Sequence, residues 1–368
     1  MKGAAFLLLL GVAFGPAIRS FAQAPEAISS TSEEPGSVIV FPKFAKGTVV
    51  VDGVTRPQTE IEVRARCPSG TTCTEDEPVK IRFHWVCPGN SDKASNYVCK
   101  EADFDVKLSV DGKASFNPEN SNLLENSVGP PAPCASGYLI GWVISPVTGQ
   151  PIKYDGLTGS AILRDGSGVI QSYKALAIQA DRNLANRAEI ATDIDPRTGT
   201  PALVFDGGAG HYQVVAGAAP ENLEYHKLTG ALATGKAPLI LLTLDVRLNR
   251  PNYPTFVDLD FRGPEGSPAS TSWNFRCWTE IQHPVIDANF TLAGAQNGNG
   301  VILSGRAEKV PFGPVSDIPG PVTLLGLVPA DDEGRGRTMA PAYILQKSDS
   351  GKPTTIFVPF EATEQVVR

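Results

Sequence analysis

Short segments in which apolar and polar residues alternate dominate the chain, and glycine and proline separate them. In residues 60–66, Ile61, Val63 and Ala65 alternate with charged residues. Because successive side chains of a strand point to opposite faces, this segment is predicted to be a strand with one buried and one solvated face. Residues 80–85 and 103–110 repeat the pattern. Residues 138–144 have no polar face, which predicts a central strand covered on both sides.

The same pattern continues along the whole chain. Further strands are predicted in the first half at residues 37–44, 157–163 and 169–178, and in the second half at residues 202–205, 212–216, 239–248, 255–262, 271–282, 301–306, 322–328, 343–346 and 355–360. Residues 181–191 contain helix formers and are predicted to form a helical turn or two. We therefore expect an all-β protein with little helix, made of two antiparallel β-sandwich (Ig-like) domains in tandem, at 37–180 and 200–368, joined by a linker at 181–199.

The first 24 residues have the features of a secretory signal peptide. Lys2 precedes an apolar run at residues 4–14, and Ala22-Gln23-Ala24 provides small residues at a cleavage site. Residues 25–36 are predicted to be a flexible N-terminal segment. The alternative is that the apolar run is retained as a membrane anchor. No later apolar run is long enough to cross a bilayer, so we expect a secreted or periplasmic protein.

All six cysteines follow the predicted signal peptide, which favours disulfide bonds. Six cysteines can pair in 15 ways. The simplest pairing joins neighbours, Cys67 with Cys73 and Cys87 with Cys99, and leaves Cys134 for Cys277 as a link between the two halves. The alternative is a zinc site, but the spacings match no zinc ribbon or finger.

Composition and charge limit the classes of partner. Hydrophobic residues make up 42% of the chain and charged residues 19%, which is typical of a folded globular protein. The formal net charge is −7 and no long basic run occurs, which argues against nucleic acid or anionic lipid as a partner. A polysaccharide or an envelope protein remains as a candidate partner.

Several segments resemble a group of secreted bacterial β-rich proteins of unknown activity. They lie at residues 37–44, 210–213, 242–246, 252–259, 275–280 and 319–326. The resemblance covers most of the mature chain. It implies a bacterial envelope setting and carries no activity.

One candidate surface comes from three strands of the second half. Laid side by side as a meander, residues 242–249, 256–262 and 273–282 would present a single polar face. That face would hold Asp245, Arg247, Asp258, Asp260, Arg276, Trp278 and Glu280. An exposed Trp278 ring could stack on a sugar, or could anchor a protein partner together with Arg276. The plainer alternative is a solvated face of cross-strand charge pairs.

The sequence favours a non-catalytic binding or structural protein over an enzyme. Asp258 and Glu280 on neighbouring strands could form the carboxylate pair of a polysaccharide hydrolase, which is the alternative function. No Gly-x-Ser-x-Gly or His-Glu-x-x-His motif occurs. No metal and no cofactor are therefore predicted, and the oligomeric state stays open.

Overall fold

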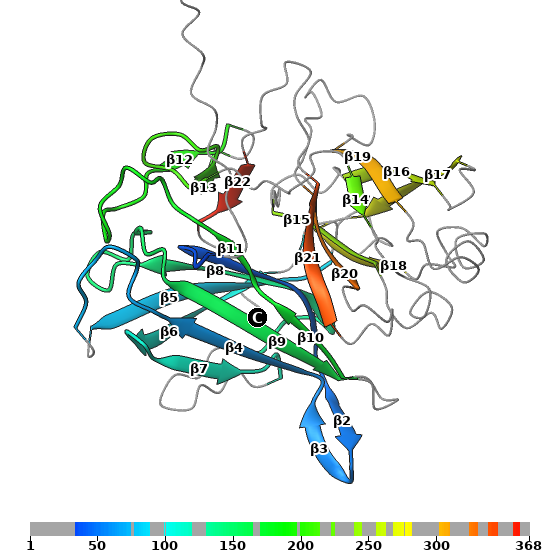
Figure 1. The fold of residues 1–368 in the computed structure, drawn as a ribbon, viewed down its shortest axis with the longest axis horizontal. Coiled ribbons are helices and arrows are strands. Elements are labelled where there is room, and N and C mark those ends of the chain that lie inside the picture. Colours follow the sequence, from blue (N-terminus) through cyan, green and yellow to red (C-terminus); the bar gives the residue numbers. More distant parts are fainter. Residues whose placement is uncertain are drawn as a thin grey trace, which may run out of the picture.

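The structure is a computed structural model. It describes residues 34–74, 77–88, 99, 101–119, 130–164, 170–196, 199–213, 222–224, 239–244, 255–262, 268–275, 277–281, 302–309, 324–329, 338–344 and 356–360. Within these ranges the chain forms strands, turns and bends and no helix (Figure 1). No helix there could span a membrane. The all-β prediction is confirmed for this part of the chain.

The strands of the first half are β1 (Val38–Ala45), β2 (Thr48–Val51), β3 (Val54–Pro57), β4 (Thr59–Ala65), β5 (Pro78–Val86), β6 (Glu101–Ser109), β7 (Lys113–Phe116), β8 (Ser136–Ile144), β9 (Leu157–Arg164), β10 (Ile170–Lys174) and β11 (Leu176–Ile178). The strands of the second half are β12 (Thr192–Ile194), β13 (Pro201–Phe205), β14 (Asn222–Glu224), β15 (Leu239–Thr243), β16 (Thr255–Arg262), β17 (Pro268–Phe275), β18 (Trp278–Ile281), β19 (Ile302–Lys309), β20 (Leu324–Pro329), β21 (Thr338–Ile344) and β22 (Ile356–Pro359).

The main core lies between two sheets. A five-stranded sheet has the order β11-β1-β8-β5-β6, and it faces strands β10, β9, β4 and β7 of an eight-stranded sheet (Figure 1). The rings of Phe83 and Phe104 stack with centroids 5.4 Å apart, and the Phe44 ring packs edge-on against Trp85 at 4.9 Å. Each large apolar side chain buried in this way contributes roughly 1.5–3 kcal/mol.

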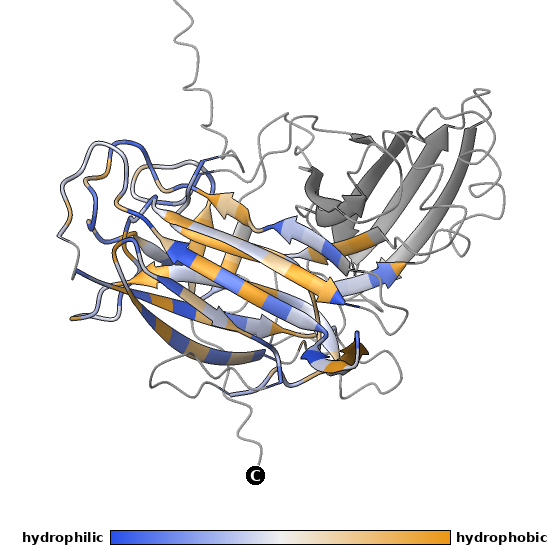
Figure 2. Ribbon diagram, turned by 60° about the horizontal axis from the view of Figure 1, so that its bottom comes forward, coloured by the Kyte–Doolittle hydropathy of each residue, from blue (hydrophilic) through white to orange (hydrophobic). Residues whose placement is uncertain are grey.

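The alternation read from the sequence sorts residues onto the predicted faces. In β4, Ile61, Val63 and Ala65 are fully buried, whereas the intervening charged residues reach solvent. Every residue of β8 after Ser136 is buried, as predicted for a central strand covered on both sides. Figure 2 shows the alternation of hydrophilic and hydrophobic residues along the strands.

The helical turn predicted at residues 181–191 is wrong. The backbone N–H of Arg187 donates to the carbonyl of Lys153, and the N–H of Ile190 donates to the carbonyl of Pro151. These groups would bond within the segment if it were helical. They bond instead to the chain that follows β8, so residues 181–191 form turns lying against it.

The eight-stranded sheet takes strands from both halves of the chain. Its order is β18-β15-β20-β21-β10-β9-β4-β7, and the halves meet where β10 pairs in parallel with β21. Ser172 lies opposite Thr338, and Tyr173 lies opposite Met339. Two separate Ig-like sandwiches are therefore not confirmed, and the proposed boundaries at 180 and 200 stay a prediction.

The strand predicted at residues 271–282 divides at Cys277. This residue has a positive φ of 59°, which a non-glycine residue rarely adopts in a strand. β17 ends at Phe275 and pairs with β16, whereas β18 begins at Trp278 and pairs with β15. The two pieces therefore belong to different sheets.

All six cysteines are paired, as Cys67–Cys73, Cys87–Cys134 and Cys99–Cys277. The predicted Cys67–Cys73 pair is confirmed. The predicted Cys87–Cys99 and Cys134–Cys277 pairs are wrong. The reason lies in strand register, because β5 and β8 are antiparallel with Val86 opposite Tyr138. Cys87, just after β5, therefore lies beside Cys134, just before β8. Disulfides of this kind are typical of an oxidising compartment, which supports a secreted or periplasmic location.

Candidate functional site

Trp278 does not offer an exposed ring to a ligand. Its side chain is 5% exposed and belongs to the hydrophobic core, and its Nε1–H donates a 2.8 Å hydrogen bond to the carbonyl of Pro42. The prediction of an exposed Trp278 is therefore wrong. Alternation placed Trp278 on a polar face, but β1 covers that side of β18.

Glu280, two residues further along β18, is an ion-pair partner of the first half. Its Oε1 lies 2.9 Å from Nζ of Lys43, and the two side chains are 28% and 12% exposed. The pair ties β18 to β1 close to the Trp278–Pro42 bond. Glu280 therefore has a structural partner and is not an isolated carboxylate.

The predicted meander does not form. β15 pairs with β18 and β20, whereas β16, which carries Asp258 and Asp260, pairs with β17 and β19 in a four-stranded sheet. Asp258 and Glu280 are therefore not on neighbouring strands, and the hydrolase alternative loses the geometry that suggested it. Asp245, Arg247 and Arg276 lie outside the described residues.

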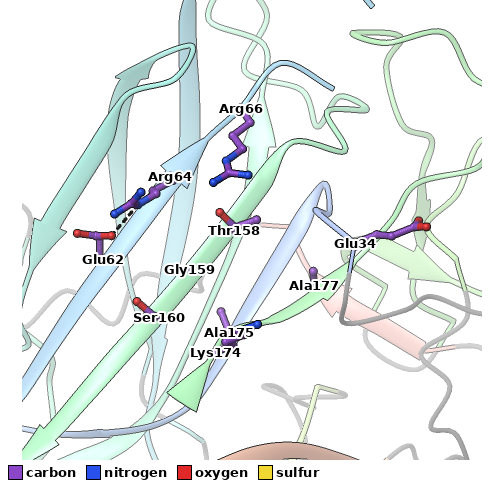
Figure 3. A pocket seen from close by; sticks show the side chains of 10 residues that line it. All are labelled: Glu34, Glu62, Arg64, Arg66, Thr158, Gly159, Ser160, Lys174, Ala175 and Ala177. Carbon is purple, nitrogen blue, oxygen red and sulfur yellow. Dashed lines mark hydrogen bonds and ion pairs between the residues drawn. The ribbon is translucent and has the colours of Figure 1, made fainter. Parts of the chain in front are cut away.

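A different exposed face carries a polar depression. It lies on the outer side of β4, β9 and β10 and has a volume of about 350 Å³. We call it the basic groove and define it by the five side chains Arg64, Arg66, Thr158, Ser160 and Lys174 (Figure 3). Glu62 and Glu34 also contribute to its lining.

Strand register brings these side chains together. Ser160 of β9 lies opposite both Glu62 of β4 and Lys174 of β10, and Thr158 lies opposite Arg64. Facing residues on paired strands lie about 5 Å apart and point to the same side. The groove is therefore a two-row array of charged and hydroxyl groups across three strands.

The positive charges of the groove are only partly neutralised. Glu62 accepts from Nε of Arg64 at 2.7 Å and lies 3.6 Å from Nζ of Lys113. The hydrogen bond from Arg64 is the main reason why the pKa of Glu62 lies below its usual range. The charge of Lys113 lowers the pKa further, whereas partial burial of the carboxylate acts to raise it. Among the described residues, Arg66 and Lys174 have no carboxylate partner.

The floor of the groove is made of small residues, Gly159, Ala175 and Ala177. A Cβ on Gly159 would come within 2.5 Å of the Phe41 ring in the core below. Glycine is thus required by the close approach of β9 to Phe41. Because side chains alternate along a strand, β9 presents backbone to the groove at Gly159, which lines it together with Arg66 and Lys174.

Half of this site could be found from the sequence. The alternation at residues 60–66 assigns Glu62, Arg64 and Arg66 to one solvated face. Thr158, Ser160 and Lys174 lie about a hundred residues away, and only the pairing of β4 with β9 and of β9 with β10 brings them to that face. No group of three or more metal-ligating side chains was found in the described part of the chain.

Comparisons with known proteins do not assign a family. No family model matches the chain, and no curated protein matches it. One similar solved structure is that of a predicted secreted protein from Parabacteroides distasonis ATCC 8503, with 7% sequence identity over 81% of this chain and 83% of that chain and a TM-score of 0.19. A TM-score this low carries no argument about function.

Proposed function

We propose that this chain is an exported, non-catalytic binding protein of the bacterial envelope or the extracellular space, and that its basic groove holds an acidic polysaccharide. The observation that carries the proposal is that Arg66 and Lys174, beside Thr158 and Ser160, have no carboxylate partner among the described residues. Cations bind the carboxylates of such a polymer, and the hydroxyls bond its sugar oxygens.

The scaffold under the groove supports a binding role. The core-facing residues of β4 and β9 include Ile61, Val63 and Ala161, which are at most 1% exposed. A core packed in this way fixes the backbone of β4 and β9, so a ligand that binds orders side chains but not the strands that carry them. The groove is open rather than enclosed, which suits a polymer.

The negative net charge of the chain means that an acidic polysaccharide is attracted only by local contacts in the groove, not by the protein as a whole. The whole chain carries −7, so a polyanion is repelled at long range and attracted only near Arg64, Arg66 and Lys174. We therefore expect moderate affinity that falls as salt is added, because exposed charge contacts are screened.

The test is binding of soluble polygalacturonate by the mature, disulfide-bonded protein at low salt, with neutral dextran as the comparison polymer. The variant Arg66→Ala/Lys174→Ala should weaken binding about tenfold, as expected for two surface charge contacts of up to about 1 kcal/mol each. The matched control is Lys107→Ala, an exposed lysine on β6, which should bind as the unchanged protein does.

Two results would overturn the proposal. One is the absence of polygalacturonate binding by the unchanged protein. The other is equal binding by the double variant. Capture of an envelope protein through the same residues, without any polysaccharide binding, would assign the groove to a protein partner instead.

A further inference from the structure

A second, larger cavity shares Glu34 in its lining with the basic groove. Its volume is about 670 Å³, within the range of small-molecule sites. Its walls come from the loop closed by the Cys67–Cys73 disulfide, from the segment after β8, and from residues 182–186. No part of the proposed function uses it.

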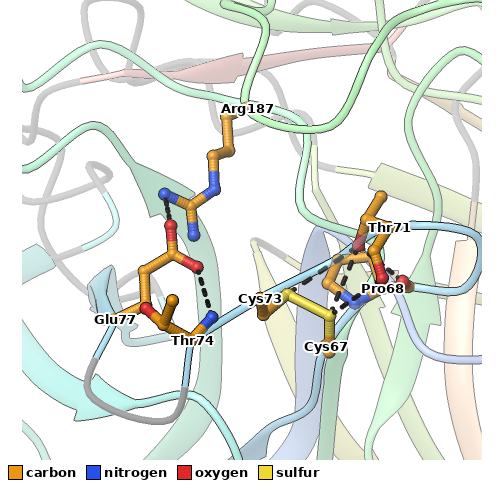
Figure 4. Close-up of a disulfide and its surroundings, with 7 residues drawn as sticks. All are labelled: Cys67, Pro68, Thr71, Cys73, Thr74, Glu77 and Arg187. Atoms are coloured by element: carbon orange, nitrogen blue, oxygen red, sulfur yellow. Dashed lines mark hydrogen bonds and ion pairs between the residues drawn. A yellow bond between two sulfur atoms is a disulfide. The ribbon is translucent and has the colours of Figure 1, made fainter.

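The walls are braced from outside. Figure 4 shows the Cys67–Cys73 bond closing a loop in which the Thr71 hydroxyl donates to the carbonyl of Pro68 at 2.6 Å. Arg187 directly follows the wall residue Asn186, and its guanidinium forms an ion pair with Glu77. Both walls therefore have fixed anchors within three residues of the cavity lining.

The floor holds a prearranged pair of opposite charges. Asp155 Oδ1 accepts from the Ser37 hydroxyl at 2.6 Å and from the Ala180 N–H at 2.9 Å. Its other oxygen, Oδ2, lies 3.9 Å from Nζ of Lys153, which is longer than a hydrogen bond. Nζ of Lys153 donates to the carbonyls of Asp181 and Arg182 at 2.7 and 3.3 Å. An ammonium has three donors, so the third is available to a ligand.

The charges around the cavity balance. Lys153 and Arg182 are positive, whereas Glu34 and Asp155 are negative. No interaction of the Arg182 guanidinium with another described residue was found. A cavity with two charges of each sign favours a ligand that also carries both signs over a simple anion or cation. This balance distinguishes it from the basic groove.

One wall residue has an unused hydrogen-bonding group. The side-chain oxygen Oδ1 of Asn186 is buried and has no hydrogen-bond partner among the residues that the structure describes. An unpaired buried acceptor is unfavourable, and rotation of the half-buried Asn186 side chain toward the cavity would let a ligand donor relieve it. Pro35, Pro68 and Leu184 add apolar surface that could take an aliphatic side chain.

From these features we infer that the cavity binds a zwitterionic ligand of the amino acid or short peptide class. The ligand carboxylate lies toward Arg182 and Lys153, and its ammonium toward Asp155 and Glu34. The amides of Asn186 and its neighbours bond the peptide groups between the charged ends.

The probe is trialanine, titrated by calorimetry into the mature, disulfide-bonded protein near neutral pH. Trialanine should bind saturably, and its doubly blocked form, N-acetyl-trialanine amide, at least about tenfold more weakly, because it lacks both charges. Arg182→Ala should weaken trialanine binding up to about fivefold, as expected for the loss of one exposed charge contact. This side chain is exposed, so the fold is not at risk.

Asn186→Ala separates binding from folding. If Asn186 serves the ligand, the substitution lowers affinity while the melting temperature stays the same or rises, because an unpaired acceptor has been removed. The basic-groove variant Arg66→Ala/Lys174→Ala should bind trialanine normally, so the two sites fail independently. Absence of saturable binding up to about 10 mM, equal binding of the blocked peptide, or an unaffected Arg182→Ala would each overturn the inference.

Discussion

The indole N–H of Trp278 donates a hydrogen bond to the carbonyl of Pro42, 236 residues earlier in the chain. The bond crosses from β18 to β1 and lies near the Lys43–Glu280 ion pair and the Tyr138 hydroxyl, which donates to the carbonyl of Thr243 at 3.1 Å. Together these contacts seat β15 and β18 on the five-stranded sheet. A ring predicted to contact a ligand instead joins two parts of the core.

Trp278→Ala should therefore destabilise the protein and leave binding at the basic groove unchanged. Truncation of a buried aromatic side chain lowers the free energy of unfolding by about 3–5 kcal/mol. Trp278→Phe keeps most of the ring and loses the hydrogen bond, at about 1 kcal/mol. Urea denaturation measures both. An alanine variant as stable as the parent would mean that the ring is not part of the core.

The Lys43–Glu280 pair should matter more than an exposed ion pair. Glu280→Gln leaves the largely buried Lys43 ammonium without its carboxylate, which we expect to lower the free energy of unfolding by about 1–3 kcal/mol. A double-mutant cycle with Lys43→Met isolates the coupling between the two residues. A coupling energy near zero would show that the pair contributes nothing.

The disulfides should differ in their effect on stability. Cys99–Cys277 closes a separation of 178 residues, whereas Cys67–Cys73 closes one of 6. In the loop-entropy model the first bond contributes roughly 5 kcal/mol and the second roughly 2 kcal/mol. Serine pairs at each position, compared by thermal unfolding, test this order. Peptide mapping of the unreduced protein tests the pairing itself, and a Cys134–Cys277 peptide would contradict it.

Removal of the Cys67–Cys73 bond should also affect the second cavity. Cys67→Ser/Cys73→Ser frees the loop that forms one wall, so trialanine binding should weaken while most of the fold remains. Polygalacturonate binding is the control, because no residue of that loop lines the basic groove. Equal trialanine affinity before and after the substitution would show that the loop needs no brace.

His84 should make the protein less stable in mild acid. It lies on β5, is 2% exposed, and has its ring 4.4 Å from that of Trp142. Burial, with the positive charge of Arg82, lowers the pKa of His84 to about 3 from its ordinary value near 6.5. Between these values the unfolded chain binds a proton that the folded chain does not, so stability falls as pH decreases below about 6.5.

The loss between pH 6.5 and pH 4 should be at most about 3 kcal/mol, since one pKa unit corresponds to about 1.4 kcal/mol. Glu101 acts in the opposite direction. Burial and the nearby Asp103 raise its pKa, so its contribution is present at low pH and is lost as pH rises. Urea denaturation across this range should therefore be done in the Glu101→Gln variant, with and without His84→Gln. The same slope in both proteins would rule out His84 as the cause.

Local pattern predicted the strands well, because alternation depends only on neighbouring residues. It identified the wet face of β4 and the full burial of β8. It could not predict which segment covers a face. Polar residues alternate with Trp278 along β18, but this pattern does not show that β1 packs over the Trp278 ring. Cysteine pairing failed for a related reason. Cys87 meets Cys134 through the register of β5 with β8, a long-range property that spacing along the chain does not contain.

The site was half predictable for the same reason. Arg64 and Arg66 share a face by simple alternation, but their neighbours Ser160 and Lys174 come from strands whose order in the sheet could not be deduced. The break at Cys277 was also hidden. A positive φ at a cysteine has no marker in the sequence, and it moved β17 and β18 into different sheets.

The parallel pairing of β10 with β21 determines where the chain can be truncated. A fragment cut off near residue 199 would expose the edge of β10, with unsatisfied amide and carbonyl groups ready to recruit another chain. It would also carry Cys99 as a lone thiol, able to crosslink copies. Recombinant production of the N-terminal half alone should thus yield aggregates linked by intermolecular disulfides. Expression of both halves together should give a monodisperse sample.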